Sequence, residues 1–170
     1  MRIQIFIMQI IAYLSIIPMI IYASWWQWII ALLMYFVLNG LGMIMTYHRL
    51  LTHRSYPCPK WLEYTLAFIT TFSLTGSAIT WIAIHRKHHK FSDTEKDPHS
   101  PDHLGFWRVQ FFTAFAEVEG RYATDLMRNN FYKWQHKHYM KIVYALAIVL
   151  LVIDPMLLVY VYLFPAGLTL

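Results

Sequence analysis

The sequence predicts an all-α, multi-pass membrane protein whose helices carry a polar, histidine-bearing cap. Hydrophobic residues make up 58% of its 170 residues, above the roughly 45–50% of soluble domains. Charge is concentrated in the middle: of 14 Lys and Arg residues only Arg2 lies outside residues 48–141, and of nine Asp and Glu residues only Asp154 does. Five of the nine histidines form two short clusters in that region. Apolar ends around a charged centre therefore indicate membrane spans joined to one cap.

The first two apolar runs predict a helical hairpin. Residues 3–22 and residues 26–46 each supply about 20 apolar or neutral positions, enough to cross a hydrocarbon core of about 30 Å. The turn between them, near Ala23, carries no charge, whereas Arg49 and Arg54 follow the second run. Because positively charged residues favour the cytoplasmic side of a membrane, we expect the histidine end of the hairpin to face the cytoplasm.

The third apolar run, residues 61–84, is rich in threonine, serine and glycine, which makes it a poor lipid-facing span. A complete crossing would put His48 and His85 on opposite sides of the membrane, and a shared site would then be impossible. We therefore expect this run to be re-entrant, with a break near Thr75–Ser77, or to lie buried against the first two spans. An ordinary span is the alternative.

The rest of the chain divides into a cap and one more span. Residues 85–141 carry most of the charge and form the predicted cytoplasmic cap. Residues 142–164 are the third predicted full span, interrupted by the Asp154–Pro155 pair. Basic residues of the cap are interleaved with acids and match no nucleic-acid-binding module, which argues against a nucleic-acid partner. No repeat or linker is visible, so we expect residues 1–170 to be one domain or part of one.

The two histidine clusters predict a metal site. Spacings of three and four place His85, His88 and His89 on one helical face. His48 and His53 are five apart, which is about 140° around an α-helix, so they can share a site only where that helix ends or deforms. Imidazole binds iron, zinc and copper. Five imidazoles exceed the three or four ligands of a mononuclear zinc site, and two metals are therefore expected.

The other polar residues near these clusters have simpler explanations than metal ligation. His99 and His103 lie at a proline-rich turn, while His136 and His138 lie on a basic stretch, so ligation by either pair is the weaker alternative. Three nearby acids suit hydrogen-bond partners of the ligands, or surface charges, better than they suit ligands. These acids are Asp93, Glu95 and Asp97.

Two motifs resemble those of a known family. HRLLTHRSY at residues 48–56 is similar to the first histidine box of the membrane fatty acid desaturases, particularly their Δ9 acyl-CoA and acyl-lipid branch. WIAIHRKHHKFSDTEKDPHSP at residues 81–101 is similar to the second box, and it is the more specific of the two motifs. The strong similarity covers roughly residues 45–108.

The resemblance implies a helical membrane fold with a cytoplasmic cap, two irons held by histidines, and oxygen-dependent introduction of a double bond, at the Δ9 position, into a saturated acyl chain. Trp81 would line the acyl tunnel, and O2 would be the co-substrate. The substrate would be a fatty acyl-CoA or an acyl lipid, with electrons from a carrier such as cytochrome b5 or ferredoxin. No catalytic residue is expected beyond the metal ligands. Carried over by position, these ligands are His48, His53, His85, His88 and His89.

The chain also departs from the family's pattern. The family's third histidine box, HxxHH, and an Asn and a His on a further helix have no counterpart here, and no histidine follows His138. We therefore expect the N-terminal portion of a desaturase, truncated after its third full span and inactive unaided. Two alternatives stay open: a related lipid hydroxylase, and a metal-binding regulatory partner of a full-length desaturase.

Overall fold

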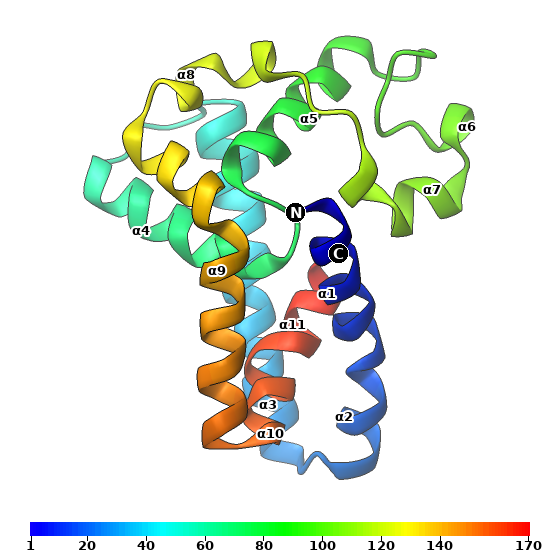
Figure 1. Ribbon diagram of the computed structural model, residues 1–170, viewed down its shortest axis with the longest axis vertical. Coiled ribbons are helices and arrows are strands. Elements are labelled where there is room, and N and C mark those ends of the chain that lie inside the picture. The colour runs from blue at the N-terminus through cyan, green and yellow to red at the C-terminus, as the bar shows by residue number, and fades with distance from the viewer.

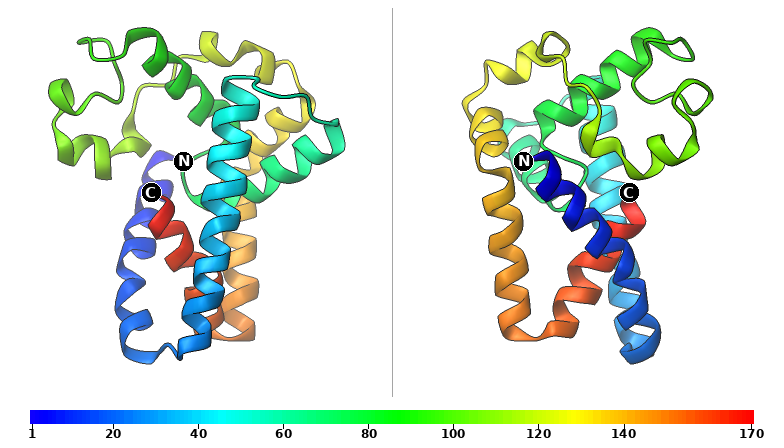
Figure 2. Two further views of the ribbon diagram at one scale, coloured as in Figure 1. Left: turned by 180° about the vertical axis from the view of Figure 1, so that it is seen from behind. Right: turned by 45° about the vertical axis from the view of Figure 1, so that its right-hand side comes forward.

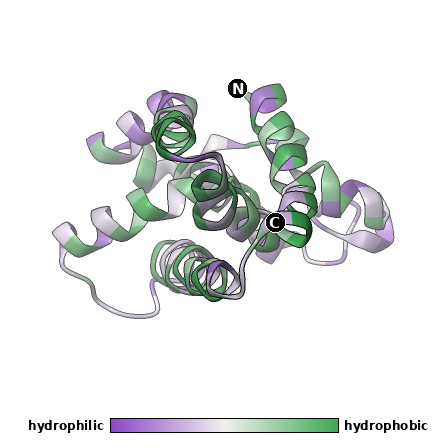
Figure 3. Cartoon of the chain, turned by 90° about the horizontal axis from the view of Figure 1, so that it is seen from below, coloured by the Kyte–Doolittle hydropathy of each residue, from purple (hydrophilic) through white to green (hydrophobic). Residues whose placement is uncertain are grey.

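A computed structural model describes the backbone of residues 1–170 and every side chain but that of Thr113. The described chain is helical and contains no strand, which confirms the all-α prediction. Long helices lie side by side, and shorter ones gather as a cap at one end of them (Figure 1). Seen along the bundle, hydrophobic residues predominate on the long helices (Figure 3). Three helices are long and apolar enough to cross a membrane: Arg2–Tyr22, Trp25–Thr52 and Asn130–Ile153.

The first two of these helices form a hairpin. One side consists of α1 (Arg2–Leu14) and α2 (Ile16–Tyr22), which follow each other with a single turn residue between them. The other side begins with α3 (Trp25–Tyr35). A capping box starts α3, because the Ser24 N–H donates to the Gln27 side chain (2.8 Å) and so satisfies a backbone group that the helix cannot bond.

The second span continues past α3 as a long π-helix, η1 (Phe36–Thr52). Its wider winding is visible in hydrogen bonds that reach five residues back along the chain. The Thr46 hydroxyl donates to the Leu41 carbonyl (2.7 Å), and the His53 N–H donates to the His48 carbonyl (3.1 Å). The helix therefore runs on beyond its predicted end at residue 46 and carries His48 within it.

The third apolar run is sharply bent. α4 (Lys60–Thr70) and a further 3₁₀ turn, η2 (Thr71–Ser73), meet α5 (Ala78–Phe91) at an angle of 84°. The bend lies in residues 74–77, where the sequence predicted a break. Both arms lie at the cap end of the bundle (Figure 1), so the first residues of α4 and the last residues of α5 are on the same side.

Side chains from distant helices satisfy the backbone at this bend. Leu74 is fully buried and has a left-handed backbone (φ 61°) that ends the 3₁₀ turn. The Gln9 amide of α1 donates to the Leu74 carbonyl (2.9 Å). The Tyr139 hydroxyl accepts from the Gly76 N–H (3.2 Å). Backbone groups that a helix break leaves unbonded must find such partners in an apolar interior.

Gln135 ties the bend to two other helices. It lies fully buried on α9 (Asn130–Ile153). Its carbonyl oxygen accepts from the Ala78 N–H (3.0 Å), and its amide nitrogen donates to the hydroxyls of Tyr47 (2.9 Å) and Thr71 (2.8 Å). One side chain thus connects α9, η1, η2 and the start of α5.

The helices after the cap differ from the predicted third span, residues 142–164. α9 begins at Asn130, inside the predicted cap, and ends at Ile153. A residue before proline avoids the helical conformation; Asp154 is accordingly extended, and its carboxylate accepts from the Leu157 N–H (2.9 Å). The chain then turns back towards the cap (Figure 2) in three short helices. They are α10 (Pro155–Leu157), η5 (Leu158–Leu163) and α11 (Phe164–Thr169).

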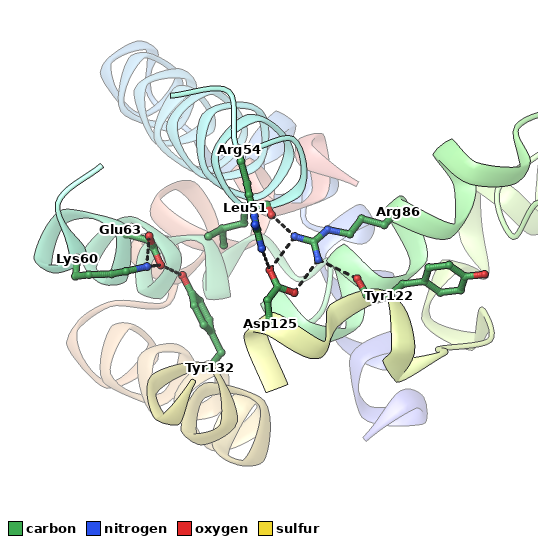
Figure 4. A network of polar contacts seen from close by, with 8 residues as sticks. All are labelled: Leu51, Arg54, Lys60, Glu63, Arg86, Tyr122, Asp125 and Tyr132. Carbon is green, nitrogen blue, oxygen red and sulfur yellow. Dashed lines mark hydrogen bonds and ion pairs between the residues drawn. The ribbon is translucent and has the colours of Figure 1, made fainter. Parts of the chain in front are cut away.

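Ion pairs hold the cap to the ends of the long helices. Asp125 accepts from Arg86 (2.8 Å) and from Arg54 (2.7 Å), and Arg86 also donates to the carbonyls of Leu51 and Tyr122 (Figure 4). Partial burial would raise the pKa of Asp125, but the hydrogen bonds from both arginines outweigh it and lower the pKa to about 2. The short elements of the cap are α6 (Pro101–Leu104), α7 (Phe106–Phe111), η3 (Thr113–Phe115), η4 (Gly120–Ala123) and α8 (Thr124–Met127).

Replacing Gln135 should destabilise the fold. In Gln135→Leu the buried Ala78 N–H loses its acceptor, and an unsatisfied buried group costs about 1–3 kcal/mol. We expect the free energy of unfolding to fall by that amount, with a lower thermal midpoint by circular dichroism in detergent. Lys137→Leu, at an exposed position on the same helix, is the control and should leave the midpoint nearly unchanged. Equal midpoints for both variants would contradict this account.

The Asp125 ion pairs should make the cap sensitive to acid. Because the pKa of Asp125 is lowered on folding, its contribution is present above the unfolded pKa of about 4 and is lost as the pH falls towards 2. Partial exposure limits this contribution to about 1–2 kcal/mol. We expect Asp125→Asn to be less stable than the unaltered chain at pH 6, and the difference to vanish near pH 2. A stability difference that stays constant between pH 6 and pH 2 would contradict this role of the Asp125 ion pairs.

Candidate metal centre

Four imidazoles converge where η1 meets α5. His48 lies near the end of η1 and His53 directly follows it, while His85 and His89 lie one turn apart on α5. Their candidate ligand nitrogens all lie within 4.8 Å of one another. We call these four residues the histidine quartet. It draws its members from two segments that only the bend between α4 and α5 brings together.

The Nε2 atoms of the quartet form a chain of close contacts. His53 Nε2 lies 3.2 Å from His48 Nε2 and 3.2 Å from His89 Nε2, and His89 Nε2 lies 3.1 Å from His85 Nε2. Nitrogens that share one metal at about 2.0–2.1 Å lie about 3–4 Å apart. The donor set therefore fits one ion that prefers imidazole nitrogen, such as iron, zinc or copper.

The π-helical winding of η1 explains how His48 and His53 meet. A π-helix has more residues per turn than the 3.6 of an α-helix, so positions five apart lie closer to the same face. The two rings accordingly have centroids 4.7 Å apart. The sequence required a helix end or a deformation at this point, and the structure contains both, since the helix is π-wound and ends at Thr52.

His85 is the most enclosed member of the quartet. Its ring stacks on Trp81, with centroids 4.4 Å apart and planes 22° apart. Burial, followed by the neighbouring imidazoles, lowers the pKa of His85 to about 3. The ring is therefore neutral at pH 7, which is the form that binds a metal. His53 and His89 lie at the exposed edge of the quartet.

The fifth predicted ligand, His88, lies beside the quartet and outside it. Its ring centroid is 5.5 Å from that of His89, but its Nδ1 contacts both carboxylate oxygens of Asp97 (2.8 and 2.9 Å). The Asp97 side chain is fully buried and also accepts from the backbone N–H groups of Asp93 and His99. Burial would raise the pKa of Asp97, but these hydrogen bonds outweigh it and lower the pKa. An ionised Asp97 thus orients His88 and leaves Nε2 as the ring nitrogen available to a metal.

The four remaining histidines lie outside the quartet in the described structure. His99 packs its ring against His88 (centroids 5.8 Å apart). His103 contacts the Asp93 carbonyl, His136 contacts the Ser77 hydroxyl, and His138 lies beside an aromatic ring. Of the three acids that the sequence offered as partners of the ligands, Asp97 is the one that contacts a predicted ligand. The sequence thus predicted a partner among these three acids, but helical periodicity could not select Asp97, because it follows a turn after α5.

A cavity of about 340 Å³ opens beside the quartet. His48 and His85 form part of its wall, and Trp81 lies next to them. Aliphatic and thioether side chains of η1 and α5 supply further wall, among them Met43, Ile44 and Ile84. Polar side chains such as Asn39 and Thr75 complete the wall, so the predicted tunnel residue lines a partly apolar cavity beside the imidazoles.

Removing the Asp97 carboxylate should weaken metal binding at His88. In Asp97→Asn the ring loses its charged partner, and loss of such a partner typically lowers metal affinity about 10–100-fold. We expect the Asp97→Asn variant to bind less tightly any ion that His88 helps to hold. The measurement is the amount of metal that the protein retains in the presence of a chelator. Asp102→Asn changes an exposed acid of the same region and should retain metal normally. Equal retention by the two variants would exclude a positioning role for Asp97.

Comparison with known proteins agrees with this geometry. A family model described as fatty acid desaturase matches residues 23–170. The chain is 38% identical over 134 residues to an sn-1 stearoyl-lipid 9-desaturase of Anabaena variabilis, an alignment that covers 75% of this chain and 48% of the relative. An acyl-CoA 5-desaturase of Anemone leveillei is 40% identical over 134 residues, with 75% and 41% covered.

A second sn-1 stearoyl-lipid 9-desaturase, from a Synechocystis species, is 34% identical over 148 residues, with 84% of this chain and 45% of the relative covered. The chain therefore spans less than half the length of these three relatives. The family model nevertheless covers most of the chain, including both histidine motifs. The resemblance carried by those motifs is confirmed, and the chain belongs to the fatty acid desaturase family.

Proposed function

We propose that this chain is the part of an oxygen-dependent acyl desaturase that holds its first two histidine boxes and introduces a double bond, at the Δ9 position, into a saturated acyl chain. The observation that carries the proposal is the convergence of four imidazoles beside a partly apolar cavity. The family supports an acyl substrate, and two of the three relatives described above are named as 9-desaturases.

The donor set supports two irons. The histidine quartet would hold one, and His88 would offer Nε2 to the other, since Asp97 occupies its Nδ1. When bound, the irons and O2 supply an oxidant strong enough to remove hydrogen from an unactivated methylene. With two electrons from a carrier such as cytochrome b5 or ferredoxin and two protons, O2 leaves as two waters while the acyl chain loses two hydrogens.

The chain's own residues would position the acyl chain. The apolar part of the cavity beside the quartet, at Met43, Ile44 and Ile84, would bind methylenes, and a bound acyl chain would displace water there, which fixes the register of the chain and protects it from side reactions. Trp81 forms a rigid wall there, because its ring lies between His85 and Tyr47 (centroids 4.4 and 5.8 Å away). Substrate positioning and metal binding thus share one side of α5.

Charge and the bend both support a cytoplasmic position of the histidine boxes. Arg49 and Arg54 flank the first box, and positively charged residues favour the cytoplasmic side. The 84° bend between α4 and α5 supports a re-entrant segment, which would bring the second box to the same side as the first. A segment that crossed completely would have separated the boxes.

A second candidate function is a metal-binding partner of a longer desaturase. The quartet can hold an ion by itself, and the chain spans less than half the length of its relatives. Such a partner would bind iron without converting substrate. The same apolar cavity would then serve the fold rather than a reaction.

Iron binding and product formation separate these candidates. We expect the purified chain to bind iron, and His89→Ala to lose the iron of the quartet because one of its four donors is gone. His138→Ala, which lies outside the quartet, should retain it. Elemental analysis of the proteins purified in detergent measures the iron content of the unaltered chain and of both variants.

Product formation is tested in a host that lacks unsaturated fatty acids. There the chain should yield a monounsaturated product when it is co-expressed with the C-terminal half of the Anabaena variabilis relative. His89→Ala should yield none, and His138→Ala should yield normal amounts. Iron binding without product in every combination would favour the regulatory partner, and absence of iron from the unaltered chain would reject both candidates.

A further inference from the structure

The histidine quartet is built across the seam between η1 and α5. His48 and His53 come from η1 and its C-terminal cap, whereas His85 and His89 come from α5. Helical winding sets the spacing within each pair of ligands, but it sets nothing between the pairs. Across the seam, His53 Nε2 lies 3.2 Å from His89 Nε2. Before an ion binds, the separation of the two elements is therefore set by contacts outside the quartet.

One carboxylate of the cap connects the two sides of this seam. In each histidine motif an arginine directly follows a ligand. These arginines are Arg54, after His53, and Arg86, after His85. Both bind Asp125 of α8, which lies between them (Figure 4). Arg86 donates to both carboxylate oxygens (2.8 and 3.1 Å), and Arg54 donates to one of them (2.7 Å). The two histidine motifs are thus joined through a single side chain, one residue beyond a ligand on each side.

Arg86 also contacts the end of η1 directly. Its Nη2 donates to the Leu51 carbonyl (2.6 Å), two residues before His53, and its Nη1 donates to the Tyr122 carbonyl (2.9 Å). The Leu51 carbonyl belongs to the last turn of η1, where carbonyls need partners from outside the helix. A planar guanidinium can bind a carboxylate and a carbonyl at the same time. The Arg86 side chain is only 21% exposed, so little water competes for these bonds.

Arg54 acts on the backbone beside His53. It has a left-handed backbone (φ 51°), which is uncommon for a residue with a Cβ. Such a conformation persists where surrounding contacts hold it, and the ion pair with Asp125 is one of these contacts. The direction of the chain directly after His53 therefore depends on that pair. Because the Arg54 side chain is 70% exposed, this contact is weaker than the one made by Arg86.

A second ion pair of α5 provides a comparison. Lys87, the next residue along α5, binds Glu119 and Glu117 in the segment before η4. This pair joins α5 to the cap, as the Arg86 pair does, and the Lys87 side chain is similarly enclosed (11% exposed). Its acids lie in the cap rather than on η1. The Lys87 pair therefore matches the Asp125 pairs in charge and place but does not connect the two histidine motifs.

We propose that Asp125 is a positioning residue of the metal centre, which fixes the separation of His53 from His89 and so sets how tightly, and in what geometry, the quartet holds an ion. This inference rests on the metal site of the proposed function, and it does not depend on the acyl substrate. Metal sites tolerate deviations of only about 0.2 Å in their ligand distances. Ligands that are already in place before the ion arrives need no rearrangement to meet that demand.

The test uses Co²⁺, a metal that imidazoles bind and whose visible absorption is strong in tetrahedral sites and weak in octahedral ones. Co²⁺ is titrated into the detergent-purified chain at pH 7, and both the affinity and the absorption per bound ion at saturation are measured. We expect Asp125→Asn to bind Co²⁺ about tenfold more weakly or worse, the usual loss when the support of a ligand is removed. The absorption per bound ion should also fall, because water replaces a displaced imidazole. A residue that only stabilised the fold would not change the spectrum of the folded, saturated protein.

Three further variants separate positioning from charge and from general loosening of the cap. Arg86→Lys keeps the positive charge but loses the planar fork that binds Asp125 and the Leu51 carbonyl together, so it should weaken Co²⁺ binding as Asp125→Asn does. Arg54→Gln breaks the exposed contact alone and should cause a smaller loss. Glu119→Gln breaks the comparison pair and should leave both affinity and absorption unchanged. Circular dichroism confirms that each variant is folded.

Unchanged Co²⁺ affinity and absorption in Asp125→Asn would overturn the proposal. Equal losses in Asp125→Asn and Glu119→Gln would also overturn it, because a loosened cap would then explain both. If Asp125→Asn does not fold in detergent, Arg54→Gln decides, and an affinity equal to that of the unaltered chain counts against the proposal. Failure of the proposed metal centre would look different, since the unaltered, folded chain would then bind no Co²⁺, which would reject the centre and its positioning residue together.

Discussion

The need to bond every buried backbone group governs this structure. An apolar helix pair can turn back inside a bundle only if the peptide groups at the turn find partners, because neither lipid nor apolar side chains can bond them. Here Gln9, Gln135 and Tyr139 bond the backbone at the turn between α4 and α5. That turn sends α5 back to the cap, and without it the two histidine clusters would be separated by the thickness of the bundle.

The quartet shows how local winding and long-range folding combine. The bend determines that α5 meets η1, whereas the π-helical turns of η1 determine that His48 and His53 point to one place. Each neutral imidazole nitrogen either donates or accepts one hydrogen bond, so the three Nε2 contacts of the quartet cannot all be good hydrogen bonds at once, whereas one ion among them would engage all four nitrogens. Departures from regular helices of this kind are common at functional sites.

The sequence predicted much of this arrangement because its strongest signals are periodic and local. Apolar runs identified the first two spans, hydroxyl-bearing residues located the break, and histidine spacing identified the four members of the quartet. The sequence did not predict that α9 starts at Asn130. Polar residues such as Gln135 and Tyr139 are buried in its first half, and in the sequence they look like residues of a water-exposed segment. Nor did the sequence predict that His88 lies outside the quartet to which His85 and His89 belong. His85 and His89 are about 40° apart around the helix, while His88 lies about 60° from His85 on the other side. Asp97, nine residues after His88, contacts the His88 ring through its carboxylate.

The quartet joins segments that are distant along the chain, which has a mechanical consequence. His53 and His89 are 36 residues apart, and the whole bent segment lies between them. An ion held by both would act as a cross-link that closes this loop and restricts the unfolded chain, much as a disulfide does. An ion present at about a thousand times its dissociation constant would add about 4 kcal/mol to the stability of the fold. Iron supply would then set how long the folded chain survives in its membrane, as well as whether it has a reactive centre.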